Sequence, residues 1–266
     1  MNMYLHELKS LRKSTLIWAG SMIAVAVLYF SVYTGIVKDA EGFRSLLAGY
    51  PAEIRTMLGI SLDTITTILG FYSMIFSFVA ICGAIQAMNY GLSVLSKESR
   101  ERTADFLLVK PVSRSAIISA KLLAALTMII ATDALYFAGA FISANLVKTS
   151  DYSFKLFFMV SLSLLFIQLM FFAFGVLISV FFKKLRAVLP ISLGFVFGLY
   201  ILGAVLVTNP NDAARYISPF QYFNIGYILN HAGYETSYAI VGAVIVVVSI
   251  AASYVIYVRK DMHAVS

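Results

Sequence analysis

The chain of 266 residues is too apolar for a soluble globular protein, because 61% of its residues are hydrophobic and only 12% are charged. A soluble core cannot bury that much apolar surface, so the composition indicates an integral membrane protein. The net charge of +7 comes from basic residues that flank apolar runs, as cytoplasmic loops do, and no soluble segment has the basic face with interleaved aromatics that binds nucleic acid. The single cysteine, Cys82, excludes an intrachain disulfide and a cysteine metal cluster.

The first fifteen residues predict a short amphipathic helix. The apolar residues Tyr4, Leu5, Leu8 and Leu11 recur at helical spacing, and charged side chains lie between them. Such a helix lies in the membrane interface with its basic side chains among the headgroups. A solvated lead-in to the first span is an equally good interpretation, since there are only four apolar anchors.

Six apolar runs are long enough to cross a hydrocarbon core of about 30 Å, which takes roughly 20 helical residues. They lie near 15–36, 64–88, 116–147, 154–182, 187–207 and 238–258. The sequence therefore predicts an all-α integral membrane protein with six transmembrane helices in a single domain, 1–266.

Basic residues predict the orientation of these spans. With both termini in the cytoplasm, fourteen of the twenty Lys and Arg residues fall in cytoplasmic segments, whereas the outer loops keep six. Positively charged residues collect on the cytoplasmic side, so we expect both termini inside and a multi-pass protein of the plasma membrane.

The two longer outer loops, 37–63 and 208–237, are too apolar to be free linkers. The first predicts a short helix docked on the outer face, through Leu46, Leu47, Ile54, Met57 and Leu58. The second is rich in Phe and Tyr, which prefer the membrane interface, and predicts one or two short interfacial or re-entrant helices before the last span. An aromatic anchor without further function is the alternative.

Groups for enzyme chemistry are missing from the predicted spans. All three histidines, His6, His231 and His263, fall outside them, and there is no HExxH motif for a metal. No serine has a histidine or buried lysine as its base. The chain has no Gly-Lys pair and so no phosphate-binding P-loop. We therefore predict that it is not an enzyme, and that any ATP hydrolysis occurs in a partner.

Asp133 lies near the middle of the third predicted span. An ionisable group there costs a few kcal/mol, so it faces the bundle interior or a water-filled cavity. One interpretation is a proton, ion or substrate contact on a translocation path. The other, which we favour because no second acid or base lies at that depth, is a hydrogen bond that ties helices together through Gln168 or Gln86.

Two further features of the spans are a pair of polar residues in the second span and a pair of glycines in the fifth span. Gln86 and Asn89, at the cytoplasmic end of the second span, are expected at the interface. Gly194 and Gly198 have the spacing that permits close helix approach.

The most highly charged stretch, 97–121, separates the second and third spans. Its first half, KESRERTADFLLVK, alternates charge with an apolar edge and predicts an amphipathic helix along the cytoplasmic surface. Pro111 ends that helix, because proline lacks the amide donor needed to continue it. Ser113 then caps a second helix that begins at Arg114 and enters the third span.

This stretch resembles the signature of ABC-2 type transporter permeases, which have an acidic-basic stretch, a Gly-Thr pair, a leucine-rich turn, a Pro-x-Ser-Arg corner and a lysine at the head of the next span. The matching residues are Glu98, Glu101, Thr103, Leu107, Leu108, Pro111, Val112, Ser113, Arg114 and Lys121. Arg102 stands in place of the usual glycine. The resemblance extends to the amino-terminal segment, the six-span layout and the ISPFQYF stretch, with Ser218, Pro219 and Phe220.

The resemblance implies a permease subunit without its own nucleotide-binding domain. Two copies, as a homodimer or a related heterodimer, would form the pore, and cytoplasmic ABC ATPase subunits carrying ATP and magnesium would dock on the loop at 97–114. The polar contacts would be Glu98, Glu101, Arg102, Asp105 and Arg114. Phe106 and Leu107 would enter a groove on the ATPase, and Thr103, Pro111 and Ser113 complete the coupling segment. No cofactor is implied for this chain.

The leading hypothesis is an ABC exporter permease. The family includes permeases for antimicrobial peptides, peptide toxins, other drugs, sodium and cell-surface polymers. Nearly uncharged spans favour an amphipathic or hydrophobic cargo, with peptides fitting best, since an ion path needs more intramembrane polar groups. The alternative is a membrane anchor or sensor that recruits a cytoplasmic protein without transport, and a membrane enzyme is less well supported than either. For the charged stretch 97–121, the alternative is a solvated loop that only sets the topology. Such a loop would need only basic residues, whereas this stretch also contains acidic ones.

Overall fold

The computed structural model describes residues 3–101, 113–182, 187–206 and 212–259, and all regular structure in these ranges is helical. Six of the helices are long and apolar enough to cross a membrane. They are α1 (Met3–Lys38), α4 (Ile68–Glu101), α6 (Arg114–Val147), α7 (Phe154–Phe181), α8 (Val188–Leu206) and α10 (Thr236–Arg259). The predicted all-α fold with six membrane-spanning helices is confirmed.

The amino-terminal segment differs from the predicted interfacial helix, because it continues without a break into the first span as α1. Neither glycine nor proline occurs between Met3 and Ala19, so nothing in this stretch interrupts the backbone ladder. The hydroxyl of Tyr4 lies 3.0 Å from that of Thr127 and links the start of α1 to α6.

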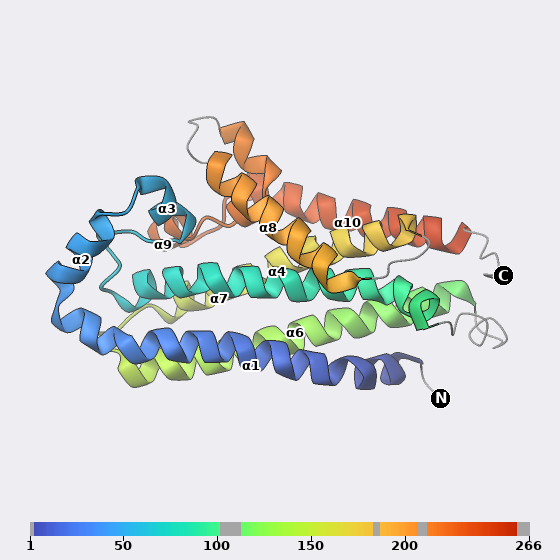
Figure 1. The fold of residues 1–266 in the computed structure, drawn as a ribbon, viewed down its shortest axis with the longest axis horizontal. Helices are drawn as coiled ribbons and strands as arrows, with labels where there is room; N and C mark the ends of the chain where they lie inside the picture. The colour runs from blue at the N-terminus through green and yellow to red at the C-terminus, as the bar shows by residue number, and fades with distance from the viewer. Residues whose placement is uncertain (1–2, 102–112, 183–186, 207–211, 260–266) are drawn as a thin grey trace.

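The long helices are arranged around a central pair (Figure 1). The central pair is α4 and α7, which make the most extensive contact in the fold. On one side lie α1 and α6, and on the other lie α8 and α10. The start of α1 and the end of α10 lie at one end of the molecule, where α4 ends and α6 begins, as an even number of crossings requires (Figure 1). We call this the terminal end, and it is the end predicted to face the cytoplasm.

The opposite end, here the distal end, is covered by short helices from the two predicted outer loops. The first loop forms α2 (Ala40–Ala48) and α3 (Ala52–Met57). The second forms two 3-10 helices, η1 (Asp212–Ile217) and η2 (Pro219–Gln221), followed by α9 (Ile225–His231). Both loops thus contain short helices as expected, but the described residues form two instead of one in the first loop and three instead of one or two in the second.

An ion pair fixes the second of these distal segments to α10. Arg215 donates to the two carboxylate oxygens of Glu235 at 3.0 and 2.6 Å and to the carbonyl oxygen of Gln221 at 3.2 Å. Its guanidinium also lies 4.3 Å from the ring centroid of Tyr238. A bidentate pair of this kind has defined geometry, so Arg215 of η1 is held in a fixed position relative to Glu235, just before α10.

The backbones of α4 and α7 touch at two glycines. A Cβ placed on Gly175 would meet the carbonyl oxygen of Met88 at 2.6 Å and the Cα of Gly91 at 3.0 Å. A Cβ on Gly91 would collide with the carbonyl oxygen of Phe172. The close approach of two helices therefore occurs at Gly91 and Gly175. The sequence suggested Gly194 and Gly198 instead, but a Cβ on either would meet nothing within 4 Å.

We expect Gly175→Ala to destabilise the protein, because the added methyl group forces α4 and α7 apart. Overpacking of this kind costs about 1–3 kcal/mol. Gly198→Ala is the matched control, since its methyl group enters open space and improves helix propensity. Thermal unfolding in detergent should give a lower midpoint for Gly175→Ala and an unchanged or higher one for Gly198→Ala. Equal midpoints for the two variants would contradict the close contact.

Candidate functional site

At the terminal end, α4 extends well past the predicted end of the second span at residue 88. It runs to Glu101, so residues 97–101 continue the spanning helix instead of starting a separate surface helix. Glu98 and Glu101 thus belong to the last two turns of α4. The other predicted coupling residues before the corner lie outside the described ranges, and they are Arg102, Thr103, Asp105, Phe106, Leu107 and Pro111.

The predicted helix start after the corner is confirmed. Ser113 has an extended backbone, and its side-chain oxygen accepts a hydrogen bond of 3.3 Å from the amide of Ala116. It is the N-cap of α6, which begins at Arg114 as expected. The cap satisfies one of the first four amides of the helix, which have no partner within it.

Lys121 joins α6 to α4 close to this corner. Only 3% of the residue is exposed, and its ammonium nitrogen donates a hydrogen bond of 2.8 Å to the carbonyl oxygen of Val94. The bond links the first turns of α6 to the end of α4. The sequence placed Lys121 within the family signature but indicated no structural partner for it.

A cavity of about 210 Å³ lies beside Lys121. It is bounded by residues of α1, α4 and α6, namely Glu7, Ser10, Leu11, Ser14, Asn89, Tyr90, Ser93, Val94 and Lys121. Polar side chains from three helices therefore surround the base of the α4–α6 connection.

In the middle of the bundle, Asp133 of α6 faces Gln168 of α7. With the Gln168 amide nitrogen turned toward Asp133, that nitrogen lies 2.9 Å from each carboxylate oxygen. In the opposite amide orientation the nitrogen donates to Gln86 Oε1 at 3.3 Å, and the Gln168 carbonyl oxygen then faces the acid. The second orientation suits a protonated acid, which has an O–H to donate. Gln168 can thus bond either form of Asp133.

Gln86 of α4 is the centre of a wider polar network. It is fully buried, not interfacial as the sequence suggested. Its amide nitrogen donates to Thr132 Oγ1 at 2.8 Å and lies 3.4 Å from the hydroxyl of Tyr90, which in turn lies 3.0 Å from Thr15 Oγ1. Hydrogen bonds therefore connect α1, α4, α6 and α7 inside the apolar core.

A second set of hydroxyls lies further toward the distal end. The hydroxyl of Tyr72 is 2.8 Å from Ser161 Oγ, and that of Tyr136 donates to Tyr72 at 3.1 Å. Both tyrosines are fully buried. These bonds join α4, α6 and α7, and like those of Gln86 they satisfy polar groups that water cannot reach.

These arrangements hold helices together and contain no reactive cluster. Within the ranges that the structure describes, no group of three His, Cys, Asp or Glu residues is close enough to hold a metal ion. The side chains of Gln86, Thr132, Tyr72 and Tyr136 bond across helices, which suits helix association in a membrane.

The family model described as "ABC-2 family transporter protein" matches residues 1–262 of this chain. The match therefore covers all six long helices and the connection between α4 and α6. A search of curated proteins returns no match to the chain.

We expect Gln86→Leu to lower the thermal midpoint in detergent, because the apolar side chain cannot form the interhelical hydrogen bond to Thr132 or the contact with Tyr90. Loss of a hydrogen bond of this kind costs about 0.5–1.5 kcal/mol. Asn145→Leu is the control, since the Asn145 amide also donates two hydrogen bonds but is exposed, so water can replace it. If the two variants lose the same stability, the network does not hold the helices together.

Proposed function

Because the chain belongs to the ABC-2 family of transporter proteins, we propose that it is the permease subunit of an ATP-driven exporter whose ATPase is a separate chain. The observation that carries this proposal is the family match over residues 1–262, on a fold with six membrane-spanning helices. A subunit of this kind contributes the passage through the membrane, and ATP and magnesium bind to its partner. A second permease copy completes the pore.

The connection between α4 and α6 is the proposed docking site for the ATPase. Both helices are continuous from this end to the distal end, since α4 spans Ile68–Glu101 and α6 spans Arg114–Val147. A push on residues 97–114 would therefore be delivered to the two helices that end and begin there. Lys121 bonds one helix to the other just inside the corner. Rigid-body movement of such elements is a common means of coupling.

The proposed cargo is an amphipathic or hydrophobic peptide. Asp133 is the acid at the centre of α6, and its bonding to Gln168 favours a structural role over an ion path. The outward faces of α8 and α10 are lined with apolar side chains, with Phe197, Ile201, Val244 and Val247 all more than 40% exposed. Such faces suit contact with lipid, with a second copy or with an apolar cargo.

The docking role is tested by co-purifying the chain with its cytoplasmic ABC ATPase. Glu101→Arg and Phe106→Asp should each reduce recovery of the complex and stimulation of ATP hydrolysis at least about tenfold, because each places an unpaired charge in the interface. Glu41→Arg makes the same charge change on α2 at the distal end and should leave both measurements unchanged. Complex formation and stimulation that survive both loop variants would rule out docking on residues 97–114.

Lys121 offers a test of coupling that is separate from docking. Lys121→Met keeps an apolar stem of similar length but removes the donor to Val94, so we expect the ATPase to bind normally while its stimulation by the permease falls several-fold. Lys148→Met is the control, since Lys148 lies at the distal end and pairs with Asp151. Normal stimulation by Lys121→Met would show that the bond does not transmit the movement.

A further inference from the structure

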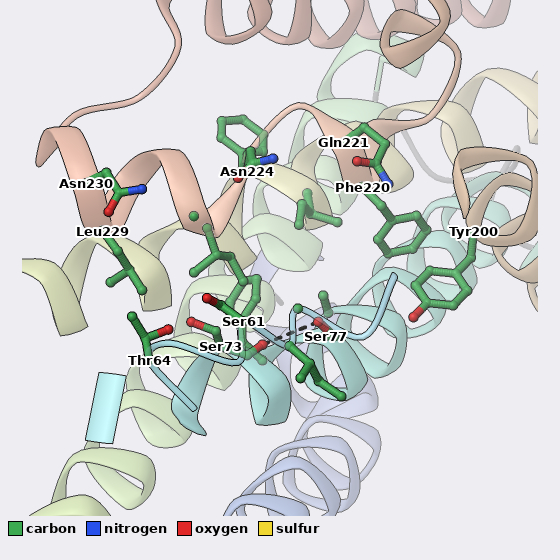
Figure 2. Close-up of a pocket in the computed structure, with 18 residues that line it drawn as sticks. Ser61, Thr64, Ser73, Ser77, Tyr200, Phe220, Gln221, Asn224, Leu229 and Asn230 are labelled. Carbon is green, nitrogen blue, oxygen red and sulfur yellow. Dashed lines mark hydrogen bonds between the residues drawn. The ribbon is translucent and has the colours of Figure 1, made fainter. Parts of the chain in front are cut away.

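The distal end contains a cavity of about 240 Å³ that the docking and coupling roles do not use. Residues of α4 and α7 and the loop before α4 form one side of it, and η2 and α9 cover it (Figure 2). Tyr200 of α8 and Phe220 of η2 close one end, with ring centroids 5.3 Å apart. The cavity thus lies within a single copy of the chain, beside the predicted outer surface.

The walls of the cavity are held in place by close packing. Gly59, in the loop before α4, has a positive φ of 66°, and a Cβ there would meet the Ser73 carbonyl oxygen and Ser77 Oγ at 2.8 Å each. The loop can therefore lie directly on α4 because this position is glycine. On the other side, the Arg215–Glu235 pair holds the segment that carries η2 and α9. The cavity is largely preformed, as ligand sites usually are.

The lining combines apolar side chains with polar ones and is uncharged. None of the eighteen described residues that form it is charged. Hydroxyl groups occupy one side, from Ser61, Thr64, Ser73 and Ser77, and amides face them from Gln221, Asn224 and Asn230 (Figure 2). An ionic ligand would lose its hydration here without gaining an opposite charge, so the lining suits a neutral ligand.

Existing hydrogen bonds show which groups the cavity can offer. The hydroxyl of Ser73 donates to the Leu69 carbonyl oxygen, and that of Ser77 donates to the Ser73 carbonyl oxygen, so each oxygen presents lone pairs. Asn224 uses its side-chain oxygen to cap α9 by accepting from the amide of Tyr227 at 3.0 Å. Its NH₂ group remains a donor, because no partner for it occurs among the described residues. The cavity thus offers acceptors on one side and donors on the other.

We propose that this cavity binds a short uncharged peptide segment on the outer side of the membrane. A peptide group has one N–H donor and one carbonyl acceptor, which match the serine oxygens of α4 and the Asn224 amide across the cavity. The aromatic end formed by Tyr200 and Phe220 suits an apolar or aromatic side chain next to that peptide group.

The size of the cavity limits what it can hold. Sites for whole drug-sized ligands are about 300–1,000 Å³. A cavity of about 240 Å³ therefore takes one or two residues and leaves the rest of a longer cargo outside. This inference rests on the proposed export of peptides. The cavity would contact the peptide on the outer side of the membrane, and it would recognise an uncharged part of the peptide.

The test is a binding titration on the full chain in lipid nanodiscs without the ATPase. Binding is monitored by saturation-transfer NMR. The probe is the capped dipeptide N-acetyl-phenylalanyl-serinamide, with a dissociation constant expected on the order of 1 mM for a ligand of this size. The charged analogue N-acetyl-phenylalanyl-aspartate should bind at least about tenfold more weakly. Maltose, a neutral polyol, separates peptide recognition from general affinity for hydroxyl-rich molecules.

Two variants locate the binding. Asn224→Asp keeps an oxygen to cap α9 but replaces the donor with a negative charge, and Ser73→Ala removes an acceptor whose own bond is local. Each should weaken dipeptide binding roughly tenfold. Asn145→Asp makes the same change on the exposed end of α6, outside the cavity, and should leave binding unchanged.

Three results would overturn the proposal. They are no dipeptide binding by the wild-type chain, equal binding by Asn224→Asp and Ser73→Ala, and maltose or charged-peptide binding as tight as that of the capped dipeptide. Because the ATPase is absent, these outcomes do not depend on docking at residues 97–114. Loss of ATPase docking in the variants of that loop, combined with no peptide binding, would keep the permease proposal and remove the cavity from it.

Discussion

The contact between α4 and α7 is the interaction on which the rest of the fold depends. Their backbones meet at Gly91 and Gly175, where neither helix has room for a side chain. In lipid, helices gain little from burying apolar surface against one another, so close packing and interhelical hydrogen bonds have to hold them. The glycine contact supplies the packing, and the network around Gln86 supplies the bonds that bring α1 and α6 onto this pair.

The same central helix serves both proposed sites. The last turns of α4 lead into the connection that would receive the ATPase, and its first turns provide Ser73 and Ser77 to the distal cavity. An α-helix held by neighbours along its length moves as one body. If both proposals hold, motion applied at the terminal end would be transmitted along α4 to the cavity.

Polar residues inside the bundle act chiefly through their partners. Asp133 faces an amide that can orient to bond either the ionised or the protonated carboxyl group, so the acid needs no opposite charge beside it. Lys121 is likewise buried with a backbone carbonyl as acceptor. Both residues therefore have hydrogen-bonding partners inside the bundle without an opposite charge among those partners.

The lengths of the apolar runs were enough to predict the six spans, and Pro111 and Ser113 were enough to predict the start of α6. Both succeed because helix formation in lipid and helix capping are local effects. The charged signature at 97–121 likewise identified the family without tertiary information. Only the tertiary structure decided that Gly91 and Gly175 meet while Gly194 and Gly198 do not, and that Gln86 is buried instead of interfacial. Those facts depend on which helix faces which, and hydropathy does not encode that choice. The distal cavity was likewise decided only by the tertiary structure, because its lining residues lie between positions 59 and 230 and become adjacent only after the chain has folded.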